Sequence, residues 1–225
     1  MDTLLKLEAE ERTKEILKKN LEELRKRIAS ACARSGHQPS SIKLVVATKT
    51  VEPPVIRMLS QLGISEIGEN KVQDAQRKHE ALKDLPLRWH MFGHLQRNKV
   101  KKALQLFELI HSLDSLPLAQ EIDRVSLSFG KRTAVLVEAN VSKEPQKYGL
   151  KEEDLPSFLE RLSPMKGLQV LGLMTMTPVM EDPEPCRPIF RRLRELSEEI
   201  KKRGIEDIRM EYLSMGMTQD FEVAI

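Results

Sequence analysis

The stretch IKLVVATKT, Ile42 to Thr50, indicates the fold class of the chain. Its β-branched apolar block, Leu44 to Ala47, is typical of a strand buried on both faces of a parallel sheet. Lys49 follows at the C-terminal end of this strand, where ligands bind in barrels and open α/β sheets. A partly desolvated lysine there can attack a carbonyl as a free amine. The alternative interpretation is a solvated lysine just past a strand.

Short apolar segments alternate with amphipathic ones along the chain. The predicted strands are residues 44–47, 65–70, 88–94, 108–114, 132–141, 168–175 and 210–215. A charged helical segment at about 3–35 precedes them, with apolar residues three and four apart. This α/β alternation predicts βαβ units and a parallel sheet. Seven units without a Gly-rich dinucleotide loop favour a (β/α)8 TIM barrel. Such a barrel has eight strands, so one strand is missing from the seven predicted here.

The composition excludes several classes of protein. No apolar run approaches the roughly 18 residues of a membrane span. The 37 basic and 34 acidic residues are interleaved and aromatic residues make up 4%, which argues against a nucleic-acid partner. Cys32 and Cys186 lie far apart and predict reduced structural thiols. The N-terminal sequence MDTLLKLEAEERTKE lacks the character of a signal or transit peptide, so we expect a cytoplasmic protein.

Two further strand ends carry polar side chains. Asn70 ends the second predicted strand and can offer a donor and an acceptor at the barrel mouth, or can simply form a turn. In the third unit, His90 and His94 would share one face of a strand. Catalytic zinc normally takes three protein ligands and no third is near, so we predict no metal site. The alternative for His90 is a hydrogen-bonded interior residue.

The seventh unit ends in LSMGMTQD, where Ser214, Gly216 and Thr218 come just as a helix starts. The backbone N–H groups of a helix start bind phosphate well, and phosphate sites in TIM barrels favour this part of the fold. A Ser/Thr-capped helix without a ligand is the alternative. A carbonyl-reactive lysine and a phosphate site match the two ends of pyridoxal 5′-phosphate (PLP), which binds through an aldehyde and a phosphate.

Five motifs carry a resemblance to a known family. They are ATK at 47–49, IGENKVQDA at 67–75, WHMFGHLQRNK at 89–99, GLMTM at 172–176 and LSMGMTQDFEVAI at 213–225. On these motifs the sequence resembles the YggS/PROSC family of pyridoxal-phosphate-binding homeostasis proteins. The motifs run in family order through nearly the whole chain.

The resemblance implies a single PLP-binding barrel over residues 1–225, of PLP fold type III and similar to the N-terminal domain of alanine racemase. It implies that Lys49 forms a Schiff base with PLP. The other implied cofactor-binding residues are Asn70, His90, Met174, Ser214, Gly216, Met217 and Thr218. Family members continue through a final strand with an Arg-Ile-Gly-Thr-like segment that helps hold the phosphate. That segment is absent from this sequence, in agreement with the seven predicted strands.

The resemblance also implies a function without robust enzymatic activity, in vitamin B6 and amino-acid homeostasis, by binding or delivering the cofactor. PLP-requiring apoenzymes are candidate recipients, and the chain is expected to be a monomer or a weak dimer. The alternative is a PLP-dependent amino-acid racemase of the alanine-racemase type. Such an enzyme needs a second base, and the only tyrosines, Tyr148 and Tyr212, lie in no extra domain. A protein-interaction module that docks through the charged N-terminal helix is a third class.

Overall fold

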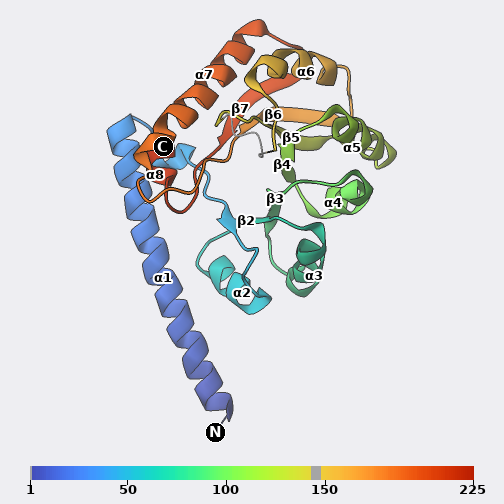
Figure 1. Cartoon of the computed structure of the whole chain (residues 1–225). Helices are drawn as coiled ribbons and strands as arrows, with labels where there is room; N and C mark the ends of the chain where they lie inside the picture. Colours follow the sequence, from blue (N-terminus) through green and yellow to red (C-terminus); the bar gives the residue numbers. More distant parts are fainter. Residues whose placement is uncertain (1, 143–147) are drawn as a thin grey trace.

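The computed structural model describes residues 2–142 and 148–225, with side chains from residue 8 onward. In this part of the chain, seven parallel strands form one sheet in chain order (Figure 1). The strands are β1 (Val46–Ala47), β2 (Glu66–Glu69), β3 (Arg88–Met91), β4 (Leu109–Leu113), β5 (Thr133–Glu138), β6 (Leu168–Met174) and β7 (Ile208–Ser214). The prediction of a parallel α/β barrel that lacks its last strand is therefore confirmed.

Helices follow the strands and lie on the outer side of the curved sheet (Figure 1). The α-helices are α1 (Asp2–Ser35), α2 (Pro53–Gln61), α3 (Val72–Leu82), α4 (Val100–Leu106), α5 (Leu116–Ser128), α6 (Leu155–Leu162), α7 (Arg187–Arg203) and α8 (Phe221–Ala224). Short 3-10 turns are η1 (Pro39–Ser41), η2 (Arg97–Lys99), η3 (Glu152–Asp154) and η4 (Glu184–Cys186). The glycine after α7, Gly204, ends that helix in the left-handed conformation.

The main core lies between the sheet and the helices. Alternate strand residues face the helices and are fully buried, among them Ile67, Ile110, Val135 and Leu173. Each such side chain contributes roughly 1.5–3 kcal/mol when it is removed from water. Because side chains alternate along a strand, the residues between them face the barrel interior. That interior is where the polar residues of the strands gather.

The first helix, α1, packs on the barrel only through its C-terminal part. Ile28 and Cys32 are buried there, and Arg27 pairs with Glu222 of α8 at 2.6 Å. Ile16, earlier in the helix, is 52% exposed. Figure 1 shows the N-terminal part of α1 running away from the rest of the molecule.

The sheet curls so that its distant strands meet inside. His111 of β4 lies 2.7 Å from Ser214 of β7, measured from Nδ1 to Oγ. Near the two edges of the sheet, the Nζ atom of Lys43 lies 5.5 Å from the centre of the Tyr212 ring. These contacts fix a barrel-like curvature although β1 and β7 are not paired with each other.

The prediction for the third strand was too long. β3 ends at Met91, and His94 lies in the following loop with 38% of its side chain exposed. The chain leaves the strand path at Gly93, where a Cβ atom would stand 2.2 Å from the carbonyl oxygen of Asn70. His90 is 2% exposed and faces the interior, so the two histidines do not share one face of a strand.

Candidate functional site

The ends of β1 and β2 present two polar side chains at the barrel mouth. Ala47 is in register with Gly68, and the Thr48 N–H donates to the Gly68 carbonyl at 2.9 Å. Lys49 comes next, in a turn, and its side chain is exposed. Asn70 follows β2 directly and is also exposed. Neither side chain has a hydrogen bond or ion pair with any described residue, so both are available to a ligand.

A buried ion pair supports the turn that carries Lys49. The Nζ atom of Lys78, on α3, donates to the Thr48 carbonyl at 2.6 Å and to Glu69 Oε1 at 2.7 Å. The Thr48 hydroxyl donates to the same oxygen of Glu69 at 2.7 Å. Lys78 is 1% exposed and Glu69 is 0% exposed. A pair in such surroundings is stable only while both charges are present, so this contact fixes the backbone just before Lys49.

Sequence reasoning missed this pair, although the sequence carries a signal for it. The buried face of α3 consists of Val72, Ala75, Lys78 and Leu82, at helical spacing. A lysine at a core position of a helix, opposite a glutamate in a buried strand, indicates a buried ion pair.

On the other side of the barrel, Met174 and Ser214 end β6 and β7 and are in register with each other. Met174 is 4% exposed. Two residues later, Gly216 has φ +84, and a Cβ atom there would come within 2.9 Å of the Ala224 side chain. Only glycine allows this turn and the close packing of α8 against it.

The loop after Ser214 holds a buried carboxylate. Asp220, 3% exposed, accepts the Met217 N–H and the Thr177 hydroxyl, each at 2.5 Å. The Met217 N–H is therefore engaged within the protein. The Thr218 hydroxyl and the backbone N–H groups of Gly216 and Thr218 donate to no other described residue. These three donors fit a phosphate group.

Four polar side chains cross the barrel interior in a continuous chain of hydrogen bonds. Glu66 Oε2 lies 2.6 Å from His90 Nε2, His90 Nδ1 lies 2.8 Å from His111 Nε2, and His111 Nδ1 lies 2.7 Å from Ser214 Oγ. We call these residues the interior chain. Both ring nitrogens of His90 have protein partners, so its predicted role in lining a cofactor pocket would be indirect. Glu66 and His111 were not identified from the sequence. Pairing of the neighbouring strands β2, β3 and β4 brings Glu66, His90 and His111 together, and the curvature of the sheet adds Ser214 of β7.

The charges along the interior chain follow from burial and partners. Burial lowers the pKa of His90 and outweighs the effect of Glu66, and burial with the nearby His90 lowers the pKa of His111 to about 3. Burial opposes ionisation of Glu66, but the His90 hydrogen bond and the charges of Lys43 and Arg88 outweigh it and lower the pKa of Glu66. The chain therefore contains one carboxylate and two neutral imidazoles at neutral pH.

A second acid, Glu138, faces the interior at the end of β5. It is 7% exposed, and its side chain has no hydrogen bond or ion pair with a described residue. Burial and the neighbouring Asp114 raise the pKa of Glu138 to about 7. Asp114 itself binds His94 Nδ1 at 3.0 Å, and the ring of His94 stacks on Tyr148 with the ring centres 4.4 Å apart.

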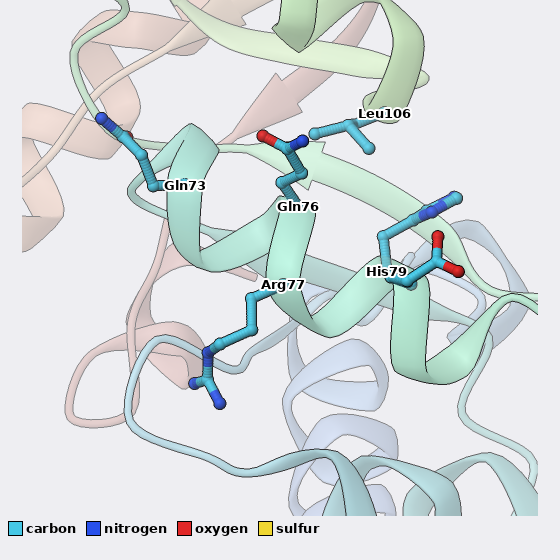
Figure 2. Close-up of a pocket in the computed structure, with 6 residues that line it drawn as sticks. Gln73, Gln76, Arg77, His79 and Leu106 are labelled. Atoms are coloured by element: carbon cyan, nitrogen blue, oxygen red, sulfur yellow. The ribbon is translucent and has the colours of Figure 1, made fainter.

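A surface pocket of about 520 Å³ lies elsewhere, on the helical layer. Figure 2 shows that it is lined by side chains of α3, including Gln76 and His79, and by Leu106 of α4. It contains none of the residues predicted to bind a cofactor.

Two kinds of feature are absent from the part of the chain that the structure describes. Residues 2–142 and 148–225 contain no helix that is long and apolar enough to cross a membrane. The same residues contain no group of three or more His, Cys, Asp or Glu side chains that could hold a metal ion.

Comparisons with known proteins agree with this geometry. The sequence matches the family "alanine racemase, N-terminal domain" over residues 17–224. It is 45% identical over 199 residues to a protein of Aquifex aeolicus named pyridoxal phosphate homeostasis protein, covering 88% of this chain and 86% of the relative. A relative of the same name in Pseudomonas aeruginosa is 32% identical, covering 92% of this chain and 87% of the relative.

Solved structures show the same fold. PipY of Synechococcus elongatus, solved with PLP bound, has a TM-score of 0.77 and 33% identity, covering 88% of this chain and 92% of PipY. An alanine racemase of Clostridium difficile, at 12% identity and a TM-score of 0.67, shares the fold over 48% of its length. The chain therefore belongs to the alanine racemase N-terminal domain family and, within it, to the group of pyridoxal phosphate homeostasis proteins.

Proposed function

We propose that this chain binds PLP through Lys49 and acts in vitamin B6 and amino-acid homeostasis by holding or delivering the cofactor, without robust enzymatic activity. The observation that carries the proposal is the placement of Lys49. It is an exposed lysine without a hydrogen-bond or ion-pair partner among the described residues. It lies on a turn anchored by the Lys78–Glu69 pair, at the ligand-binding end of a parallel barrel. Membership of the pyridoxal phosphate homeostasis group supports it.

The residues at the mouth fit the two ends of PLP. When bound, PLP supplies an aldehyde carbon and a phosphate group. The amine of Lys49 would hold the aldehyde end, with Asn70 beside it. The Thr218 hydroxyl and the N–H groups of Gly216 and Thr218 would hold the phosphate, and Met174, on the sixth strand, would lie near the cofactor. Met217 contributes through backbone geometry, because Asp220 already accepts its N–H.

The positions of the tyrosines support a binding protein over a racemase. A two-base racemase needs a second proton donor that faces the lysine-bound substrate. Tyr148 is 61% exposed and stacks on His94. Tyr212, on β7, lies against Lys43, which precedes β1 in the chain. Neither ring is joined to Lys49 by a contact. We therefore infer that neither tyrosine acts as the second base.

A spectroscopic titration tests the proposal. The visible absorbance that develops when PLP is added to the purified protein should saturate at one PLP per chain, and Lys49→Ala should abolish it. The matched control is Lys71→Ala, which removes an exposed lysine next to Asn70 and should leave the titration unchanged. Full absorbance in Lys49→Ala would contradict the proposal. Assays with amino-acid enantiomers separate the alternatives, because steady racemisation by the loaded protein would favour the racemase.

Delivery and location extend the same proposal. PLP-requiring apoenzymes are the recipients that we propose, in the cytoplasm, with the chain as a monomer or a weak dimer. Activation of a PLP-free apoenzyme by the loaded protein, compared with an equal concentration of free PLP, tests delivery. The PLP concentration should be far below the dissociation constant of the apoenzyme for PLP. Equal activation rates with the loaded protein and with free PLP would then argue that the chain holds PLP without delivering it.

A further inference from the structure

The interior chain links the barrel floor to the mouth. Glu66 lies at the start of β2, and His90, His111 and Ser214 belong to β3, β4 and β7. Three hydrogen bonds of 2.6, 2.8 and 2.7 Å connect them in that order. Both histidines are almost fully buried, at 2% and 4% exposed, so water does not compete for their ring nitrogens. The orientation of each group is therefore coupled to that of the next.

The direction of the hydrogen bonds is set at Glu66. Its second oxygen, Oε1, pairs with Lys43 at 3.4 Å and with Arg88 at 3.2 Å, so the carboxylate is held as an anion. A second acid, Glu108, also binds Arg88, at 2.8 Å. An ionised carboxylate can only accept, so His90 must donate from Nε2.

A neutral imidazole has one donor and one acceptor nitrogen, so each step follows from the one before. With its proton on Nε2, His90 accepts at Nδ1. His111 must then donate from Nε2 and accept at Nδ1. The remaining partner of His111 is the Ser214 hydroxyl, whose only proton is therefore directed into the barrel.

We propose that Glu66, His90 and His111 orient the Ser214 hydroxyl so that it offers only acceptor lone pairs to a ligand at the barrel mouth. The inference rests on the proposed function and refines it. Ser214 would accept a hydrogen bond from a nitrogen-bound proton of the ligand, which for PLP means the protonated ring nitrogen, instead of donating to a phosphate oxygen. Glu66, His90 and His111 act through Ser214 and are positioning residues.

The substitution Glu66→Gln gives a sharp test, because it reverses the chain. Lys43 and Arg88 still require an acceptor, so the amide oxygen of Gln turns to them and its NH₂ group donates to His90 Nε2. His90 and His111 must then carry their protons on Nδ1, and the Ser214 hydroxyl becomes free to donate to the ligand. Gln has nearly the shape of Glu, so packing inside the barrel is preserved.

The first measurement is ¹⁵N NMR of the histidine rings in the PLP-free chain near neutral pH. We expect the proton on Nε2 of His90 and His111 in the parent and in Ser214→Ala, and on Nδ1 of both in Glu66→Gln. An Nδ1 proton on either histidine of the parent would overturn the proposal. This measurement does not depend on PLP, so it remains decisive even if the proposed function fails.

The second measurement is PLP affinity, with Lys49 unchanged throughout. A single misdirected hydrogen bond should weaken PLP binding about tenfold in Glu66→Gln and by a similar factor in Ser214→Ala. In the Ser214→Ala background, Glu66→Gln should not change the PLP affinity further, because Glu66 acts on the ligand only through Ser214. Unchanged affinity in Glu66→Gln despite reversed tautomers would overturn the ligand assignment alone. A parent chain that binds no PLP would overturn the proposed function and that assignment together.

Discussion

The barrel interior and the barrel mouth contain similar polar residues in opposite states. In the interior, Glu66, His90 and His111 each use their polar atoms in hydrogen bonds or ion pairs. At the mouth, the side chains of Lys49, Asn70 and Thr218 have no partner among the described residues. Because unmet polar groups are costly when buried, the interior groups have a structural or positioning role. The mouth groups are free to meet a ligand.

Two glutamates show the contrast most clearly. Both face the interior and both are nearly buried, yet the pKa of Glu66 is lowered while that of Glu138 is raised to about 7. Lys43, Arg88 and His90 surround Glu66, whereas the nearest charge to Glu138 is another acid, Asp114. The partners of a buried acid, and not burial alone, decide its charge.

The largest expected effect comes from breaking the ion pair beneath the mouth. Lys78→Met leaves the Glu69 carboxylate buried without its cation and should lower the free energy of unfolding by about 3–5 kcal/mol. Urea unfolding measures this, and Lys71→Met, at an exposed position before α3, is the control. A loss below about 1 kcal/mol would mean that the Lys78–Glu69 contact does not act as a buried ion pair.

The next effect is a gain in stability at the interior acid Glu138. The folded chain holds a proton on Glu138 up to about pH 7, whereas an unfolded chain releases it near pH 4.5. Stability therefore falls as pH rises between these values, by about 1.4 kcal/mol per pH unit. Glu138→Gln should remove that loss. Between pH 4.5 and pH 7, the free energy of unfolding of Glu138→Gln should therefore rise by about 3 kcal/mol relative to that of the parent. A pH-independent difference, as expected for the exposed control Glu160→Gln, would contradict the raised pKa.

The interior residue His111 should make stability depend on pH in the opposite direction. An unfolded chain protonates His111 below about pH 6.5, but the folded chain resists until about pH 3. Stability from this group is complete above pH 6.5 and is lost as pH falls, by about 2 kcal/mol at pH 5. His111→Gln should flatten the curve between pH 5 and 7, whereas the exposed control His37→Gln should not. An unchanged slope in His111→Gln would show that the ring is not held neutral.

The smallest expected effect on stability is at the lysine that matters most for function. Lys49→Ala removes an exposed side chain that has no hydrogen bond or ion pair with a described residue, so the free energy of unfolding should change by less than about 0.5 kcal/mol. The same substitution should abolish the absorbance of lysine-bound PLP. A loss of several kcal/mol would mean that Lys49 has a structural role at the mouth.

Much of the fold could be predicted because it depends on local patterns. The apolar run before Lys49 and the regular alternation of strand and helix predicted a parallel barrel of seven strands. The third strand was predicted three residues too long, because Gly93 has no local signal for the close approach to Asn70 that ends it. Strand ends depend on such tertiary contacts.

The site could be predicted only in part. Lys49, Asn70 and the Ser214–Thr218 loop follow strand ends, so their common location follows from the topology of a parallel sheet. The interior chain could not be predicted, since it depends on the strand register of β2, β3 and β4 and on the curvature that brings Ser214 of β7 to His111. His90 attracted attention as a motif residue, but its partner His111 lies in no motif.

The most direct test of the central claim is to reduce the PLP-loaded protein with borohydride and to map the modified peptide. The account predicts a single adduct on Lys49, at the mouth, and none on the buried Lys78 or the neighbouring Lys71. An adduct on another lysine, or no adduct in a protein that retains PLP, would contradict it.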